Sequence, residues 1–194
     1  MVKPIFILIV AFLLSLSPEK VFSQNYNKLV YNVKGDLNND NLEDLVTVKA
    51  DTADLHHPFL FEIKFQTKGG KYVTVLKSET AVMDKYPEGT SSSLCILESL
   101  KVNKGMIIFR NQMDRGSMTH KFRFQHNNFE LIGYTYHYAA PGAMEFVDYN
   151  LSTGEKLEKK TEYETDQILE KKTSIVKMNP LPNLKNFHPL DFTY

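Results

Sequence analysis

Apolar and polar residues alternate along almost the whole chain, and turn-forming residues separate the alternating runs. The clearest run is residues 59–66, followed by another at residues 72–77, with Gly69 and Gly70 in the short connection. Alternation with period two is typical of β-strands that bury one face, and a glycine pair permits the tight turn of a hairpin. The pattern therefore predicts a mainly β protein with little helix.

We expect a single antiparallel β-meander domain, folded as a sandwich or as a barrel-like sheet. The predicted strands are residues 29–33, 45–50, 59–66, 72–77, 105–111, 120–126, 129–138, 146–151 and 156–164, with a last long element at 167–178. Residues 94–101 fit either a strand or a buried turn. The charged block at 155–172 also fits a helix, but recurring Thr and Tyr favour strands. Alternation does not supply register, so sandwich and barrel both stay open.

The N-terminus has the pattern of a secretory signal peptide. Lys3 precedes an apolar run from Ile5 to Leu16, and residues 21–23 suit the cleavage positions. The run is shorter than the roughly 20 apolar residues of a membrane-spanning helix. We therefore expect a signal peptide at residues 1–23, a single β-rich domain at residues 24–194, and a secreted or periplasmic protein. The only cysteine is Cys95, so none lies near the cleavage site to carry a lipid anchor.

The charge balance excludes several kinds of partner. Removal of residues 1–23 leaves a net charge near −1, without a run of basic residues. Nucleic acids and anionic membranes are bound through concentrated positive charge. We therefore expect no nucleic-acid partner and no stable membrane insertion after cleavage, whereas the oligomeric state stays open. One cysteine makes no internal disulfide, so Cys95 is expected to be buried in its apolar run.

Oxygen-bearing side chains recur at short intervals in the segment from Gly35 to Asp44, directly before an apolar strand. Hard cations such as Ca²⁺ take six to eight oxygen ligands, which a tight acidic loop supplies. The predicted calcium ligands are the side chains of Asp36, Asn38, Asp40 and Asp44 and the carbonyl of Leu42. Asn41 occupies the position where such loops turn sharply, and asparagine tolerates left-handed backbone. An Asx-rich loop without metal is the alternative.

This segment resembles the calcium loops of FG-GAP and VCBS-type repeats, in which a stretch of Asp and Asn residues leads into a β-strand. The matching residues are Asp36, Asn38, Asp40 and Asp44, followed by residues 45–48. The resemblance covers one copy of about a tenth of the chain, so it implies a calcium-stabilised turn in an exported bacterial protein, and it implies no enzymatic role. One copy is too little for a propeller.

Two further groups of residues are candidates for binding or catalysis. Tyr134, Tyr136 and Tyr138 share one face of a strand, with Glu130 at the start of that face, so they offer aromatic contacts or simply pack in the sheet. Glu130, Glu145 and Asp148 are the candidate carboxylates of a hydrolase, although their spacing gives no support. Adjacent His56 and His57 are interpreted as a polar loop.

The sequence favours a non-enzymatic exported β-domain with a structural calcium ion that binds a protein or glycan partner. No Gly-x-Ser-x-Gly motif or cysteine–histidine signature is present. An apolar environment would raise the pKa of Cys95 rather than activate its thiol. The alternatives are a periplasmic inhibitor or immunity-type protein and a hydrolase with an unrecognised carboxylate site.

Overall fold

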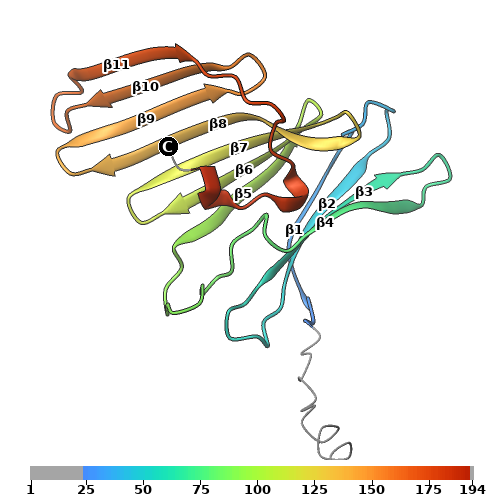
Figure 1. The fold of residues 1–194 in the computed structure, drawn as a ribbon. Coiled ribbons are helices and arrows are strands. Elements are labelled where there is room, and N and C mark those ends of the chain that lie inside the picture. Colours follow the sequence, from blue (N-terminus) through green and yellow to red (C-terminus); the bar gives the residue numbers. More distant parts are fainter. Residues whose placement is uncertain (1–23, 193–194) are drawn as a thin grey trace, which may run out of the picture.

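The chain folds into two antiparallel sheets, as a computed structural model that describes residues 24–192 shows (Figure 1). The predicted signal peptide, residues 1–23, lies outside the described residues. The small sheet has the order β1-β2-β3-β4 and the large sheet the order β11-β10-β9-β8-β7-β6-β5. Within each sheet, every strand pairs with its neighbours in sequence, so each sheet is a meander, and neither closes into a barrel. The expected mainly β fold is confirmed.

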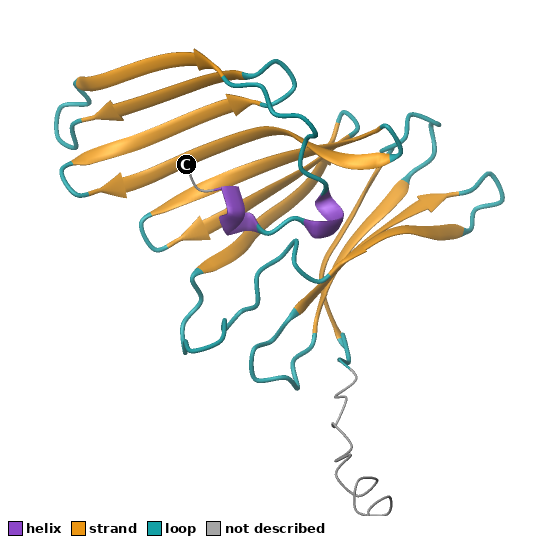
Figure 2. Ribbon diagram, in the orientation of Figure 1, coloured by secondary structure: helices purple, strands orange, loops and turns teal. Residues whose placement is uncertain are grey.

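The strands cover most of the described chain, with two 3₁₀ turns near its end (Figure 2). The small sheet contains β1 (Lys28–Gly35), β2 (Asp44–Ala50), β3 (Phe59–Gln66) and β4 (Tyr72–Ser78). The large sheet contains β5 (Cys95–Asn103), β6 (Met106–Met113), β7 (Gly116–Gln125), β8 (Asn128–Ala140), β9 (Ala143–Asn150), β10 (Glu155–Thr161) and β11 (Ile168–Ile175). The 3₁₀ turns are η1 (Leu184–Asn186) and η2 (Pro189–Phe192).

The two segments with ambiguous patterns are both strands. Residues 94–101 belong to β5, and the charged block at 155–172 forms β10 and β11 rather than a helix. Strand β7 begins at Gly116, earlier than predicted, because Gly116 pairs with Tyr138 on the long strand β8. A Cβ atom on Gly116 would lie 2.1 Å from the carbonyl oxygen of His137, so glycine permits this close pairing.

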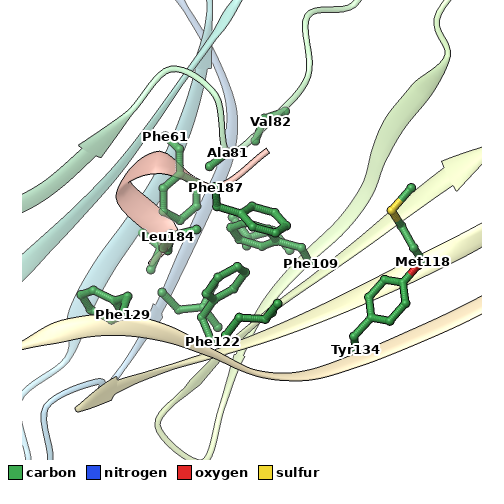
Figure 3. Packing of buried hydrophobic residues seen from close by; sticks show 14 of the residues in the cluster. Phe61, Ala81, Val82, Phe109, Met118, Phe122, Phe129, Tyr134, Leu184 and Phe187 are labelled. Atoms are coloured by element: carbon green, nitrogen blue, oxygen red, sulfur yellow. The ribbon is translucent and has the colours of Figure 1, made fainter. Parts of the chain in front are cut away.

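The hydrophobic core lies mainly between the small sheet and strands β5 to β8 (Figure 3), with Val147 and Tyr149 of β9 at its margin. Phe61 from β3 meets Phe109 from β6 edge-on, with the ring centroids 5.1 Å apart. The C-terminal segment closes the core, since Phe187 packs 4.9 Å from the ring of Phe122. The apolar C-terminal tail therefore packs back on the domain.

The large sheet extends beyond the small sheet, so strands β9 to β11 form its uncovered half (Figure 1). Strand β11 is solvent-exposed at every position except Ser174. On the other side, the edge strands β1 and β5 meet, and the Tyr31 hydroxyl donates hydrogen bonds to the carbonyls of Leu97 and Glu98. Among residues 24–192, no helix has the length and apolarity needed to cross a membrane.

Candidate functional site

The acidic loop connects β1 to β2 and turns sharply at two asparagines. Asn39 and Asn41 have φ angles of 61° and 63°. Left-handed backbone of this kind is tolerated by asparagine better than by most other residues with side chains. The expectation that Asn41 takes the place of a glycine is confirmed.

Three predicted ligands come together inside this loop. The backbone N–H of Asp40 donates to Oδ1 of Asp36, at 3.2 Å, and to Oδ1 of Asn38, at 3.1 Å. The second oxygen of Asp36 accepts from the N–H of Asn41 at 2.8 Å, and Oδ1 of Asp40 accepts from the N–H of Leu42 at 2.9 Å. These are Asx-type hydrogen bonds, and they shape the loop from its own side chains.

Asp44 anchors the loop to the small sheet. Its carboxylate is fully buried and accepts hydrogen bonds from the backbone N–H groups of Leu37 and Gln66, each at 2.9 Å. Burial raises the pKa of this carboxyl above its ordinary value, and the charges of Asp40 and Asp36 add to the rise against the two hydrogen bonds. Asp44 therefore joins the loop to the end of β3.

The donor set suits a cation only in part. Asp36, Asn38 and Asp40 keep oxygen lone pairs beyond those in the loop's hydrogen bonds, because each such oxygen has two. Asp44 accepts two backbone N–H groups in the same way, but its carboxylate is fully buried against Leu37 and Gln66. Within residues 24–192, no three or more His, Cys, Asp and Glu side chains form a group that could hold a metal ion. A cation would therefore rest on the three converging side chains and on main-chain oxygens such as the carbonyl of Leu42.

The tyrosines of β8 form a stacked ladder on one face of the large sheet. The rings of Tyr134 and Tyr136 have centroids 6.3 Å apart, those of Tyr136 and Tyr138 5.8 Å apart, and both pairs are tilted by 17°. The guanidinium of Arg115 lies 5.9 Å from the Tyr138 centroid. Both faces of Tyr136 are thus covered by its neighbours. Sugars stack on open aromatic faces, so this ladder is a poor platform for a glycan.

Glu130 lies on the face opposite the tyrosines, contrary to the prediction. A β-bulge in β8 shifts the register, because Leu131 pairs with Phe122 whereas Gly133 pairs with Lys121. The extra residue, Ile132, moves every earlier side chain of β8 to the other face. Glu130 instead accepts a hydrogen bond from Gln125 at 2.6 Å.

The three candidate carboxylates of a hydrolase do not form a pair. Glu145 pairs in register with Tyr138, whereas Asp148 pairs with Thr135, so the two lie on opposite faces of β9. Glu145 forms an ion pair with Lys160 at 3.2 Å, and Asp148 accepts a hydrogen bond from Thr135. Glycoside hydrolysis needs two carboxylates flanking one bond, and this arrangement does not provide them.

The uncovered half of the large sheet combines charged pairs with exposed aliphatic side chains. A hollow of about 280 Å³ opens over β9 to β11, with Glu145, Glu158 and Lys160 in its lining. Two aliphatic side chains of β11 are mostly exposed, Ile168 at 55% and Ile175 at 63%. They pair with Thr161 and Glu155 and so lie on the face of the sheet opposite the hollow. Large exposed apolar residues beside polar groups are typical of protein-interaction surfaces.

The remaining candidates from the sequence, Cys95, His56 and His57, make contacts that stabilise the fold. Cys95 is buried as predicted, and burial raises the pKa of its thiol to about 11, which disfavours the reactive thiolate. Nδ1 of His56 lies 3.0 Å from the carbonyl oxygen of Tyr86, and the His57 ring meets the Tyr86 ring edge-on. These two histidines therefore join two loops, in agreement with the polar-loop interpretation.

Two polar clusters escaped the sequence analysis. His120 is fully buried between the rings of Tyr134 and Phe187. Glu62 is buried on the small sheet and lies within ion-pair distance of three lysines. Alternation along β3 places Glu62 and Lys64 on the same face of the sheet. Lys49 and Lys77 come from the neighbouring strands, whose register the sequence does not reveal.

Comparisons with known proteins return no match. No protein-family model matches this chain, and neither the curated proteins nor the solved structures include a significant match to it. The functional argument therefore rests on the geometry described above.

Proposed function

We propose that this protein is an exported, non-catalytic recognition domain that binds a protein partner through the uncovered half of its large sheet. The single observation that carries the proposal is the exposure of β11, whose aliphatic side chains lie beyond the reach of the small sheet. Folding gains little from leaving such side chains in water, whereas association removes them from it. Export follows from the signal-peptide pattern of residues 1–23.

A protein partner fits this surface better than a glycan does. The ring faces of Tyr136 are occupied by Tyr134 and Tyr138, so the centre of the tyrosine ladder offers a sugar no open ring face. The uncovered half instead offers an unpaired strand edge with exposed aliphatic side chains on one face, while its opposite face carries ion pairs such as Lys172 with Glu158. Exposed strand edges pair with extended segments of other proteins.

The decisive test is capture of a partner from an envelope extract of the source cells, with the mature chain as bait. We expect one protein to bind the wild type and to be lost when Ile168 and Ile175 are both replaced by Asp. The matched control replaces Val73 and Val75, exposed at 53% and 44% on the edge strand of the other sheet, by Asp. Equal capture by all three baits, or loss in the control alone, would contradict the proposal.

We further propose that the acidic loop is a single loop of the FG-GAP or VCBS type that binds a structural Ca²⁺ ion. Support comes from Asp36 and Asn38, which both accept from the N–H of Asp40, from the Asp40 carboxylate, which accepts from the Asn38 amide, and from the turn at Asn41. When bound, the ion would offset the mutual repulsion of the loop carboxylates. Its role would be to order the connection between β1 and β2.

Thermal unfolding in calcium and in chelator tests the ion. A ligand that binds only the folded state stabilises it by about 2.7 kcal/mol at one hundred times its Kd, so millimolar Ca²⁺ should raise the Tm. Asp36→Asn should remove most of this rise, whereas Asp114→Asn, at an exposed turn, should leave it unchanged. An identical Tm in calcium and chelator would show that the loop is shaped by its Asx hydrogen bonds alone.

A further inference from the structure

The outer face of the small sheet concentrates positive charge. Strands β1 to β4 contain five lysines but only two carboxylates, and one of these, Asp44, is buried against backbone N–H groups. Core residues such as Val46, Val48 and Phe61 point to the inner face. Side chains of a strand alternate between faces, so Thr47, Lys49 and Glu62 lie on the outer face.

Glu62 is the centre of this face. Its side chain is only 5% exposed, and its carboxylate lies 3.2 Å from Lys49 Nζ, 3.3 Å from Lys77 Nζ and 3.7 Å from Lys64 Nζ. The three ammonium groups come from three adjacent strands, and the register of the sheet brings them to one carboxylate. They therefore lie close to one another despite their mutual repulsion.

One carboxylate does not balance three ammonium groups. Burial raises the pKa of Glu62, but hydrogen bonds and charges from the lysines outweigh this and hold the pKa below its ordinary value. Glu62 is thus ionised at neutral pH, and two positive charges remain uncompensated. The exposed Lys34 on β1 lies on the same face. It pairs with Leu45 on β2, and Leu45 pairs with Lys64 on β3, so Lys34 adds a further positive charge to this row.

A buried hydroxyl without a partner lies in the middle of the same face. Thr47 pairs directly with Glu62 in the sheet, is 6% exposed, and its Oγ1 has no hydrogen-bond partner within the described part of the chain. Leaving a buried hydroxyl unpaired costs free energy. The unpaired hydroxyl is a second observation, separate from the lysine charges. It can donate a hydrogen bond to an acceptor bound at this face.

We propose that this face binds a doubly charged oxyanion of the phosphate or sulfate type, held by Lys49, Lys64 and Lys77 and accepting a hydrogen bond from Thr47. The site lies on the small sheet, whereas the proposed protein-binding surface lies on the large sheet. The two proposals are therefore independent. Lysines bind such groups as point charges with several donors, and charge-assisted hydrogen bonds are about twice as strong as neutral ones. The bound group is either a free anion or an ester on a larger molecule, since the three lysines recognise the same oxygens in both.

Calorimetric titration of the mature chain with inorganic phosphate and with sulfate, at constant ionic strength set by chloride, tests the site. We expect saturable binding of both divalent anions and a raised Tm in their presence. The double variant Lys64→Gln with Lys77→Gln should weaken binding about ten-fold or more, the scale of losing one hydrogen bond to a charged group. The matched control, Lys171→Gln with Lys172→Gln on β11, should bind like the wild type.

Thr47→Val separates the proposed site from general attraction to positive charge. The substitution keeps every lysine and removes a hydroxyl without a partner, so the free protein should be as stable as the wild type or slightly more stable. Its affinity for phosphate should fall several-fold. Unchanged affinity in this variant, or equal weakening in the β11 control, would overturn the proposal.

Two further probes identify the source of the anion. A sulfated polysaccharide or vesicles containing anionic phospholipid should compete with inorganic phosphate for the wild type, and the one that competes more strongly carries the physiological group. Binding of vesicles that is insensitive to phosphate and to Thr47→Val would contradict a local oxyanion site. Failure of these experiments would leave capture of a protein partner through β11 unaffected, so the two proposals fail separately.

Discussion

The two halves of the large sheet have the same topology but opposite burial. In the half formed by β5 to β8, Ile107, Phe109 and Phe122 are fully buried under the small sheet. In the half formed by β9 to β11, most side chains reach solvent, and Glu158 and Lys172 stand where the other half has aromatic rings. The same succession of antiparallel hairpins therefore supports a core in one half and a surface in the other.

The difference comes from the second layer. The small sheet and the C-terminal segment cover β5 to β8 and reach the buried Val147 and Tyr149 on β9, and Phe187 packs in this cover against His120 and Phe122. Strands without a covering layer rely on their own ladders and cross-strand pairs, each of which contributes a fraction of a kcal/mol. The covered half thus contributes most of the stability of the fold, and the uncovered half is available as a binding surface.

The largest expected effect contrasts a phenylalanine from each half. Phe109→Ala removes a ring packed against Phe61 and Phe122, and should lower the free energy of unfolding by about 3–5 kcal/mol. Phe146→Ala, at a partly exposed position on β9, should cost about 1 kcal/mol or less. Urea denaturation measures both. Comparable losses would mean that the uncovered half contributes to folding as much as the core does.

The pH dependence of stability should differ between a buried and an exposed histidine of the covered half. Burial lowers the pKa of His120 from 6.5 to about 3, so the unfolded chain binds the proton first as the pH falls. The stability linked to His120 is therefore complete above pH 6.5 and is lost progressively toward pH 3. His120→Phe should flatten the curve of unfolding free energy over this window. His137→Phe, at an exposed position of β8, should flatten it less, because partial burial and the charges of Arg110 and Lys159 lower the pKa of His137 in the same direction but less strongly. Parallel curves for His120→Phe and the wild type would contradict this.

The smallest expected effect concerns the edge of the uncovered half. Replacing Ile168 and Ile175 together by Asp should change the free energy of unfolding by about 0.5 kcal/mol or less, since both side chains already lie in water. The same variant should lose the protein partner. Thermal unfolding and circular dichroism check that the fold is intact, and a large drop in Tm would show that β11 is structural.

Much of this architecture could be predicted from period-two alternation, including the meander, the β3–β4 hairpin and the tyrosine ladder. What alternation does not reveal is register. The bulge at Ile132 moved Glu130 to the other face, and only the pairing of β2, β3 and β4 brings Lys49 and Lys77 to Glu62. The boundary of the covering layer is also a tertiary property, although the Lys- and Glu-rich composition of β10 and β11 is the sequence signal that accompanies it.

In the acidic loop, the sequence predicted a turn and a set of oxygen ligands. The turn follows from the local preference of Asn39 and Asn41 for left-handed backbone. The role of Asp44 depends instead on contact with Gln66 at the end of β3, which is distant in sequence. The spacing of the oxygen-bearing residues therefore did not distinguish Asp44, which anchors the loop to the sheet, from Asp36, Asn38 and Asp40, which come together inside it.

Native-state hydrogen exchange of the mature chain tests the contrast between the two halves most directly. Amides of β6 and β7 should exchange only through global unfolding, because both strands are central in the sheet and covered by the core. Amides of β10 and β11 should exchange through local opening, with a free energy several kcal/mol lower. Equal protection across all seven strands would contradict the account, because the uncovered half would then belong to the same cooperative core.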